Sequence, residues 1–424
     1  MTTQSHHLTR AERGISLNLA SLFSLRMLGI FIIIPIFAQH AASLEGVTPF
    51  LAGLFMSGYA LTQIILQPIF GMLSDKFGRK ETIVAGLLFF VIGSAIIAFT
   101  SNIHVAILGR IIQGTGAIGA VILALATDLT REEVRSKVMA IIGITIGLTF
   151  GVAFFISPKL YAFTESLGFS GGLGVFLLCA ILGVLGILLA WFMLPTPPKI
   201  DRSAAEAAGG LENFKAAFKD GNINRLYFGG MMVHMILTLA FTAFPFYLIN
   251  HGFDNAVSWR VYVPGFLISI ILLFPIVGFA ERFYHHRKVF LMAIGLLGLA
   301  LMLTFFKISY GGLLVVMMLF FLGFNTLEAM QPSLMSRFAP ADNRGMVMGI
   351  FSSSQFIGIA VGGQLGMQLR GSFESPLVVF FAAILLVLAW LYVAYPMKNP
   401  VRKPKTDDPS EATAATDNRE SNEG

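Results

Sequence analysis

Charged residues are scarce in this chain, and cysteine is almost absent. Only 12% of the 424 residues are charged and 56% are hydrophobic, whereas soluble domains average about 25% charged residues. So little charge cannot cover the surface of a soluble core of this length, which excludes most enzyme classes built on soluble scaffolds. Cys179 is the single cysteine, so an intramolecular disulfide and a CxxC metal site are also excluded.

What the sequence has instead is a series of long apolar runs. A helix that crosses a bilayer needs about 20 mostly apolar residues, and the alternation typical of a membrane barrel is missing. The sequence therefore predicts an all-α polytopic membrane protein with twelve transmembrane helices. The predicted spans are residues 15–38, 49–73, 81–100, 103–128, 137–157, 172–194, 223–249, 259–280, 288–306, 312–336, 345–368 and 376–396.

The basic residues indicate the orientation of these spans. With the N-terminus placed inside, 23 of the 29 Lys and Arg residues fall in cytoplasmic segments and four fall in outer loops. Cytoplasmic loops carry an excess of Lys and Arg, so we expect both termini to be cytoplasmic. The net charge of +6 therefore does not indicate nucleic-acid binding, because the basic residues lie in short loops beside the membrane.

Two short sequence matches suggest an internal duplication. Pro68 and Pro275 each begin a Pro-Ile-x-Gly segment at the end of a span, 207 residues apart. Arg135 and Arg344 each open a span with Met four residues later, 209 residues apart. Agreeing offsets at equivalent places predict two six-helix halves. The predicted domains are a first half at 1–194, a cytoplasmic linker at 195–222, a second half at 223–397 and a disordered, polar cytoplasmic tail at 398–424.

Two motifs carry a resemblance to a known family. The loop from Gly71 to Lys80 reads GMLSDKFGRK and resembles the signature loop of the major facilitator superfamily. The segment from Gly109 to Ala120 reads GRIIQGTGAIGA and is similar to a motif of proton-driven antiporters. Stretches at 21–31, 125–140 and 324–334 resemble YajR-type proton-coupled drug-efflux transporters of bacteria. The resemblance implies a fold of two pseudo-symmetric halves and transport by alternating access.

The resemblance also implies a gate on the cytoplasmic side. An acid at Asp75 can face the positive N-terminal end of a neighbouring helix, and Arg79 can pair with Asp128. In the family this cluster latches the loop to the eleventh span and favours the outward-open state. The alternative is a solvated basic loop that serves only topology. The candidate gating residues are Gly71, Asp75, Gly78, Arg79, Lys80 and Asp128.

The fourth span supplies a second implied site. Arg110, Gln113 and Gly114 match the antiporter motif, so the resemblance implies that Arg110 assists proton transfer. The alternative is that Arg110 snorkels toward the outer interface, as long basic side chains do readily.

Three ionisable residues lie deeper in the predicted spans. Glu328 is the only acid well inside a span, and charges inside a bilayer cost about 2.5–3.5 kcal/mol on insertion scales, which marks them as functional candidates. Desolvation favours the neutral carboxyl, so we expect Glu328 to load and release a proton. Arg26 would bias that titration or bind an anionic substrate, and His234 would share the relay. The alternatives are a static Arg26–Glu328 pair and a His234 that is simply hydrogen-bonded and buried.

Other polar and small residues within the spans have plainer roles. Gly143, Gly147 and Gly151, and likewise Gly358, Gly362 and Gly366, form small-residue ridges that predict close helix packing. The candidate substrate contacts are Arg26, Tyr59, Gln63, Asn325, Gln331 and Gln355.

Taken together, these features favour proton-coupled export, or antiport, of hydrophobic or amphipathic compounds. The alternative is proton-coupled uptake, or symport, of a small metabolite or organic anion, which Arg26 would suit. HExxH does not occur, so an enzyme is not expected; a receptor without turnover is a further alternative. We expect no cofactor, metal or nucleic acid, and a monomer in the bilayer that binds substrate and protons. The resemblance implies the bacterial inner membrane.

The signature loop generates a first prediction. Asp75→Asn should leave expression and folding intact but reduce transport, because the amide removes the charge that a helix N-terminus would attract. Transport assays on protein matched for expression level check this. Normal transport by a well-expressed variant would contradict a gating role for Asp75.

Overall fold

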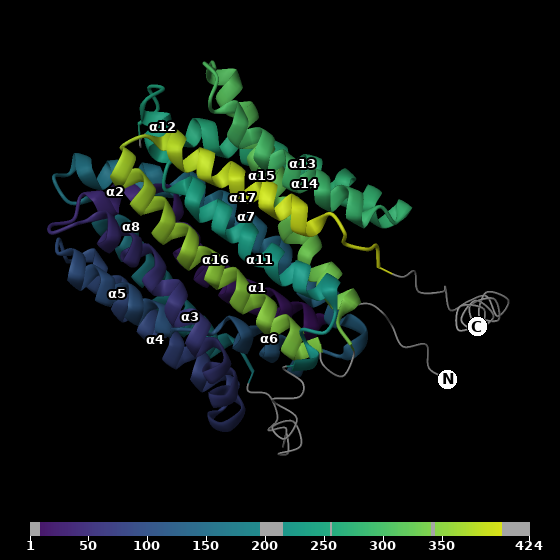
Figure 1. Ribbon diagram of the computed structural model, residues 1–424. Coiled ribbons are helices and arrows are strands. Elements are labelled where there is room, and N and C mark those ends of the chain that lie inside the picture. Colours follow the sequence, from purple (N-terminus) through teal and green to yellow (C-terminus); the bar gives the residue numbers. More distant parts are fainter. Residues whose placement is uncertain (1–8, 196–214, 255–256, 341–343, 401–424) are drawn as a thin grey trace, which may run out of the picture.

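The computed structural model describes residues 9–195, 215–254, 257–340 and 344–400. In this part of the chain the structure is helical, apart from one isolated bridge between Glu45 and Asn102. The helices form one bundle (Figure 1). The all-α prediction is therefore confirmed. Most of the predicted linker and nearly all of the predicted tail lie outside the described residues.

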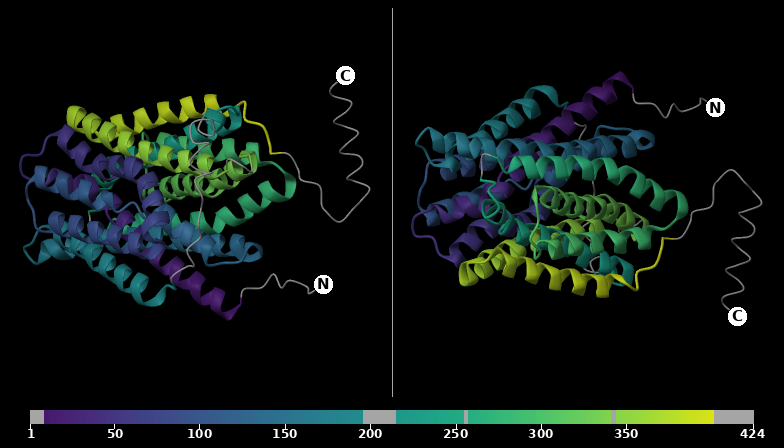
Figure 2. Two further views of the ribbon diagram at one scale, coloured as in Figure 1. Left: turned by 90° about the horizontal axis from the view of Figure 1, so that it is seen from below. Right: turned by 90° about the horizontal axis from the view of Figure 1, so that it is seen from above.

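The helices of the two halves gather on separate sides of the bundle (Figure 2). Those of the first half are α1 (Arg10–Phe31), η1 (Ile34–Ile36), α2 (Phe37–Ala42), α3 (Pro49–Phe77), α4 (Arg79–Ala98), α5 (Ile103–Thr115), α6 (Gly119–Asp128), α7 (Glu132–Ser166) and α8 (Gly171–Met193). Those of the second half are α11 (Gly221–Phe241), α12 (Phe244–Ile249), α13 (Trp259–Phe283), α14 (His286–Leu303), α15 (Tyr310–Phe338), α16 (Arg344–Phe373) and α17 (Pro376–Ala394).

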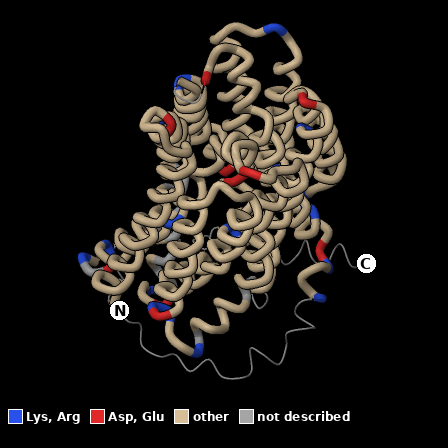
Figure 3. Tube along the Cα trace, turned by 90° about the vertical axis from the view of Figure 1, so that its left-hand side faces the viewer, with Lys and Arg blue, Asp and Glu red and all other residues tan. Residues whose placement is uncertain are grey.

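The lengths of these helices fit a polytopic membrane protein. Among the described residues, eleven helical segments are long and apolar enough to cross a membrane. The predicted fifth span lies in α7, a helix of 35 residues that extends past the predicted bounds at both ends. Charged residues lie mainly at the ends of the bundle and in its loops (Figure 3), as expected when the middle is surrounded by lipid.

Spans 1 and 7 lie where the sequence predicts them, but each consists of more than one helix. In span 1 the helix ends at Phe31 and resumes through η1, which has Pro35 in its first turn. In span 7 it ends at Phe241 and resumes in α12, which has Pro245 in its first turn. Proline lacks the N–H that a continuous helix needs and is tolerated in a first turn. The two prolines are 210 residues apart, which agrees with the predicted duplication.

Span 4 is also broken, between α5 and α6. The backbone leaves the helical region at Gly116, where φ is −70° and ψ is 58°. A side chain at this position would overlap the carbonyl oxygen of Gly86 on α4, so glycine is required by the close approach. The break frees the carbonyl of Gly114, which accepts a hydrogen bond from the side chain of Gln63 on α3.

Polar side chains outside the apolar runs fix where several helices begin. Each accepts hydrogen bonds from backbone N–H groups that lack a partner in the first turn. These N-cap residues are Thr48 before α3, Asn102 before α5, Asp220 before α11 and Ser309 before α15.

A ridge of glycines lets α16 pack closely on α11. Added Cβ atoms at Gly358 and Gly362 would overlap the backbone carbonyls of Met231 and Met235. The predicted close packing of this ridge is confirmed. In the other predicted ridge, Gly151 lies against a ring of α13, and the surroundings of Gly143 and Gly147 lie outside the described residues.

Aromatic side chains of α7 join the first half to the second. The ring of Phe150 lies 5.6 Å from that of Phe266 and 5.7 Å from that of Phe324, and Phe154 lies 5.4 Å from Tyr262. Phe150 and Phe154 therefore belong to the buried core of the second half. Each such aromatic pair contributes about 0.5–1.5 kcal/mol beyond its buried area.

The glycine ridge generates a second prediction. Gly358→Val should lower the stability of the bundle by about 1–3 kcal/mol or more, because overpacking forces the backbones apart. Gly349→Val is the matched control, since Gly349 lies on the same helix with nothing within 4 Å of an added Cβ. Thermal unfolding in detergent should show a lower midpoint for Gly358→Val alone. Equal midpoints for the two variants would contradict the close contact.

Candidate functional site

Three polar side chains of the second half meet around Glu328. Glu328 projects from α15, His234 from α11 and Gln355 from α16. The amide of Gln355 donates to Oε1 of Glu328 at 3.3 Å. Nε2 of His234 lies 3.8 Å from Oε2 of the same carboxylate, and the Glu328 side chain is 39% exposed. Solvent can therefore reach the side chain, although it belongs to a membrane span.

The facing atoms of His234 and Glu328 define a place for one proton. Nδ1 of His234 lies 3.2 Å from the carbonyl oxygen of Gly230, so in the neutral imidazole Nδ1 carries the hydrogen and Nε2 is an acceptor. Nε2 then faces Oε2, which is buried and has no hydrogen-bond partner among the described residues. At 3.8 Å the two acceptors can share a proton only when the side chains move closer together.

Arg26 lies in the first half, apart from this group. Its Nη2 donates to Oε1 of Gln63 at 3.3 Å, and Nε2 of Gln63 donates to the carbonyl of Gly114 at 2.8 Å. Arg26 is 3% exposed and makes no ion pair with Glu328. The interpretation of a static Arg26–Glu328 pair was therefore wrong, because Gln63 holds the guanidinium beside the break in span 4.

Arg110 is buried rather than directed to the outer interface. Its Nη1 donates to Oε1 of Gln113, whose Nε2 donates to Oγ of Ser94 at 2.8 Å. The guanidinium also lies 5.0 Å from the ring centre of Tyr59 and 5.8 Å from that of Phe55. Arg110 is 6% exposed, so snorkelling does not describe it. Sequence reasoning missed Ser94, a single serine in an apolar span.

The remaining candidate substrate contacts are scattered. Tyr59 and Gln63 are buried in the first half beside the two arginines. Asn325 is half-buried and donates to Oγ of Ser269 at 3.0 Å. Gln331 is 1% exposed and lies beside Gly229. Of the five, only Gln355 joins the Glu328 group directly.

The signature loop is held by Arg79 at the start of α4. Nε of Arg79 donates to Oδ2 of Asp128 at 3.0 Å, and Nη1 donates to Oγ of Ser74. The predicted contact between Arg79 and Asp128 is confirmed. The side chain of Asp75 lies outside the described residues.

The other candidate gating residues shape the loop. Gly78 ends α3 with φ 110°, a conformation that favours glycine. Nζ of Lys80 donates to the carbonyl of Leu194 at 3.1 Å and so joins α4 to the end of α8. Gly71 has open space around it.

The second half carries a counterpart that sequence reasoning missed. Nη2 of Arg337 donates to both oxygens of Glu281, at 2.9 and 2.7 Å, and Nε2 of His286 lies 4.0 Å from Oε2 of Glu281. The offsets of 207 and 209 residues relate His286 to Arg79 and Arg337 to Asp128. These offsets were the signal that could have found the cluster.

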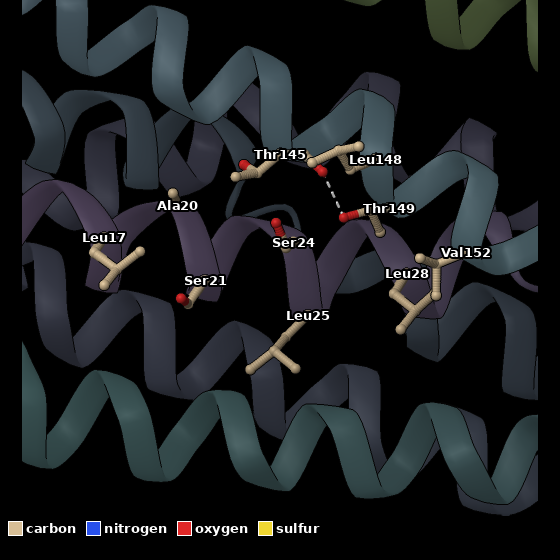
Figure 4. A pocket seen from close by; sticks show the side chains of 10 residues that line it. All are labelled: Leu17, Ala20, Ser21, Ser24, Leu25, Leu28, Thr145, Leu148, Thr149 and Val152. Carbon is tan, nitrogen blue, oxygen red and sulfur yellow. Dashed lines mark hydrogen bonds between the residues drawn. The ribbon is translucent and has the colours of Figure 1, made fainter. Parts of the chain in front are cut away.

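A groove between α1 and α7 is walled mainly by apolar side chains (Figure 4). Its volume is about 430 Å³. Ser21, Ser24, Thr145 and Thr149 bring hydroxyl groups to it, but Thr149 donates to the carbonyl of Thr145 at 2.6 Å. No charged residue lines the groove, so its chemistry suits an apolar molecule.

Comparison with known proteins establishes the family. The sequence model of the Major Facilitator Superfamily matches residues 19–363 and, in a second match, residues 255–420. The chain belongs to this superfamily. It is therefore a multi-pass membrane transporter, as the signature loop predicts.

Relatives and solved structures of the superfamily resemble the chain over most of its length. The inner membrane transport protein YajR of Escherichia coli (strain K12) is 38% identical over 398 residues, which cover 93% of this chain and 86% of YajR. The multidrug resistance protein MdtH of Aeromonas salmonicida (strain A449) is 26% identical over 80% of this chain and 82% of MdtH. The crystal structure of a D-xylose-proton symporter has a TM-score of 0.72 at 16% identity, over 92% of this chain and 99% of that chain, which shows a shared fold.

One contact between the two halves lies at the end of the bundle where α3 and α13 begin. We call this end of the bundle the outer end. Nζ of Lys159, on α7, lies 3.9 Å from the ring centre of Phe155 and 4.0 Å from that of Trp259 on α13. At the same end, Gln364 of α16 donates to the carbonyl of Phe50 on α3 at 3.3 Å. Both contacts must separate if the halves part at the outer end.

This contact generates a third prediction. Trp259→Ala should favour conformations that are open at the outer end, since a cation–π contact of about 0.5–2 kcal/mol is lost, which raises the open population about twofold or more. Electron–electron distance measurements between spin labels at Ser166 and Asn250, both exposed, check this. Trp191→Ala is the control, because Trp191 faces Lys80 within one half. Identical distance distributions in all three proteins would contradict the prediction.

Proposed function

We propose that this transporter exports hydrophobic or amphipathic compounds in exchange for protons, and that Glu328 carries the proton. The observation that carries the proposal is the buried Oε2 of Glu328, which has no hydrogen-bond partner and faces Nε2 of His234 at 3.8 Å. A carboxylate oxygen so placed gains a partner when a proton arrives.

The geometry suggests how proton and substrate exclude each other. With the proton bound at Oε2, the carboxyl is neutral and can donate to His234. Without it, the carboxylate keeps the hydrogen bond from Gln355 and presents an uncompensated negative charge to solvent. A cationic or polar substrate group is attracted to that charge, so proton and substrate compete for one carboxylate. Competition of this kind produces exchange.

The buried arginines of the first half have supporting roles in this proposal. Hydrogen bonds connect Arg110 through Gln113 to Ser94. Hydrogen bonds also connect Arg26 through Gln63 to the carbonyl of Gly114 at the break in span 4. We assign to both arginines the task of setting the electrostatic field at Glu328. Charges in a poorly solvated interior act over longer distances than charges in water.

Alternating access supplies the movement. We assign the cytoplasmic gate to the cluster of Asp75, Arg79 and Asp128, supported by the contact between Arg79 and Asp128. The contacts of Lys159 and Trp259 would close the outer end. Each set would form while the other separates.

Two observations support an apolar or amphipathic substrate. The groove between α1 and α7 has an uncharged, largely apolar lining. A relative at 26% identity is named a multidrug resistance protein. We also infer a bacterial inner-membrane location, supported by the name of the E. coli relative, with both termini cytoplasmic and a monomeric functional unit.

A second candidate function is proton-coupled uptake of an organic anion. Arg26 and Arg110 are buried, and neither has a carboxylate partner among the described residues. Buried charges are expected to be paired, so an anionic substrate could supply the missing partner. Imposed proton gradients separate the two functions, because an inward gradient drives substrate export in antiport and import in symport.

The proposal generates a fourth prediction. In proteoliposomes, Glu328→Gln should abolish substrate-dependent proton movement, because the amide cannot bind the proton. Exchange of labelled for unlabelled cationic substrate without a gradient should weaken as well, because proton and substrate compete for this carboxylate. Lipophilic cations and small organic anions are the probes, and proton movement is followed with a pH-sensitive dye.

Glu45→Gln is the matched control, since Glu45 is exposed in the loop before α3. Proton movement that survives in Glu328→Gln at the wild-type rate would move the proton site to His234 or elsewhere, and would leave Glu328 with a structural role.

A further inference from the structure

A second cavity lies between the start of α11 and the end of α17, away from the Glu328 group. Its volume is about 850 Å³, and its walls come only from these two helices and the residues just after α17. Arg225 and Asn224 line it on α11, Tyr392 lines it on α17, and Tyr395 lines it just after α17. The start of α11 and the end of α17 lie at the end of the bundle where we expect the cytoplasm.

The walls of this cavity are amphipathic. Arg225 and Asn224 provide a guanidinium and an amide at one end, and Phe228 and Leu391 provide apolar surface further along both helices. Tyr392 is 83% exposed, as expected for an aromatic residue at a membrane interface. A molecule that fits must therefore be polar at one end and apolar at the other.

The guanidinium of Arg225 is available for a ligand. Arg225 is half-buried, and no acid pairs with it in the part of the chain that the structure describes. A second arginine lies beside the cavity, since Nε of Arg287 donates to the carbonyl of the lining residue Tyr395 at 3.0 Å. The charge of these two guanidinium groups is complementary to an anion.

The first half shows what the equivalent place looks like when it is closed. The offset of 207 residues relates Arg225 to Asn18 on α1. Nδ2 of Asn18 donates to the carbonyl of Met193 at the end of α8, at 3.2 Å, and so ties the two helices together. In the second half an arginine replaces this asparagine, and the corresponding helix ends enclose a cavity instead.

We propose that this cavity binds an anionic phospholipid, with its phosphate on Arg225 and an acyl chain along Phe228 and Leu391. The occupant follows from the position of the cavity: it opens at the rim of two membrane spans, where lipid is the surrounding medium, and its charge is complementary to a phosphate. Basic pockets between transmembrane helices on the cytoplasmic side bind lipid headgroups in this way. The inference stands independently of the transported substrate and of the proton site.

Native mass spectrometry of the purified full-length protein tests the proposal. The protein in detergent is titrated with phosphatidylglycerol and, separately, with phosphatidylcholine. We expect tighter binding of phosphatidylglycerol to the wild type, and Arg225→Gln should weaken it about tenfold or more, since a charge-assisted hydrogen bond is lost. Arg225→Lys keeps the charge and should retain most of the binding.

Arg282→Gln is the matched control, because Arg282 is an exposed arginine in the last turn of α13 and does not line the cavity. Thermal unfolding confirms that each variant is folded. Equal binding of the two lipids by the wild type would overturn the proposal, as would unchanged phosphatidylglycerol binding by folded Arg225→Gln. Displacement of the lipid by millimolar inorganic phosphate would also overturn it, since the site would then recognise the anion alone.

Discussion

The scarcity of water inside a bilayer is the constraint on which this structure depends. A polar group there must find its partner within the protein, and the first half meets this demand with short relays. Gln63 joins Arg26 to the free carbonyl of Gly114, and Gln113 joins Arg110 to Ser94. Several buried polar atoms of the described residues lack a hydrogen-bond partner, and Oε2 of Glu328 is the one carboxylate oxygen among them. An acid inside a membrane span is a candidate functional residue.

The separation of Arg26 from Glu328 has a direct chemical consequence. An arginine in contact with a carboxylate strongly favours its charged form, and such a pair would keep Glu328 ionised throughout a transport cycle. Gln63 holds Arg26 in the first half, so the polar groups that face Glu328 are a neutral amide and an imidazole. No arginine contact therefore fixes the charge of this carboxyl group in the described residues. Because the cations lie in one half and the acid in the other, relative movement of the halves changes the field at the carboxylate.

Much of this arrangement could be predicted from the sequence. Apolar runs of sufficient length predicted the helices. The motif from Gly71 to Lys80 predicted the superfamily and the contact of Arg79 with Asp128. The breaks in three spans could not be placed from the sequence. Gly116, for example, does not differ in the sequence from other glycines of the spans, and only the structure shows that it packs against the carbonyl of Gly86. The partner of Arg26 was misjudged for a related reason: depth along a helix is readable from sequence, whereas the face on which a side chain lies depends on packing.

The two halves show how duplication preserves positions while their chemistry diverges. Arg79 with Asp128 and His286 with Arg337 occupy places that the offsets of 207 and 209 residues relate in the two halves, yet the acid in the second cluster comes from a third residue, Glu281. In both clusters the charges join helix ends that α-helical packing alone would leave free to slide. Backbone geometry is therefore shared by the halves, whereas the charges on it are not.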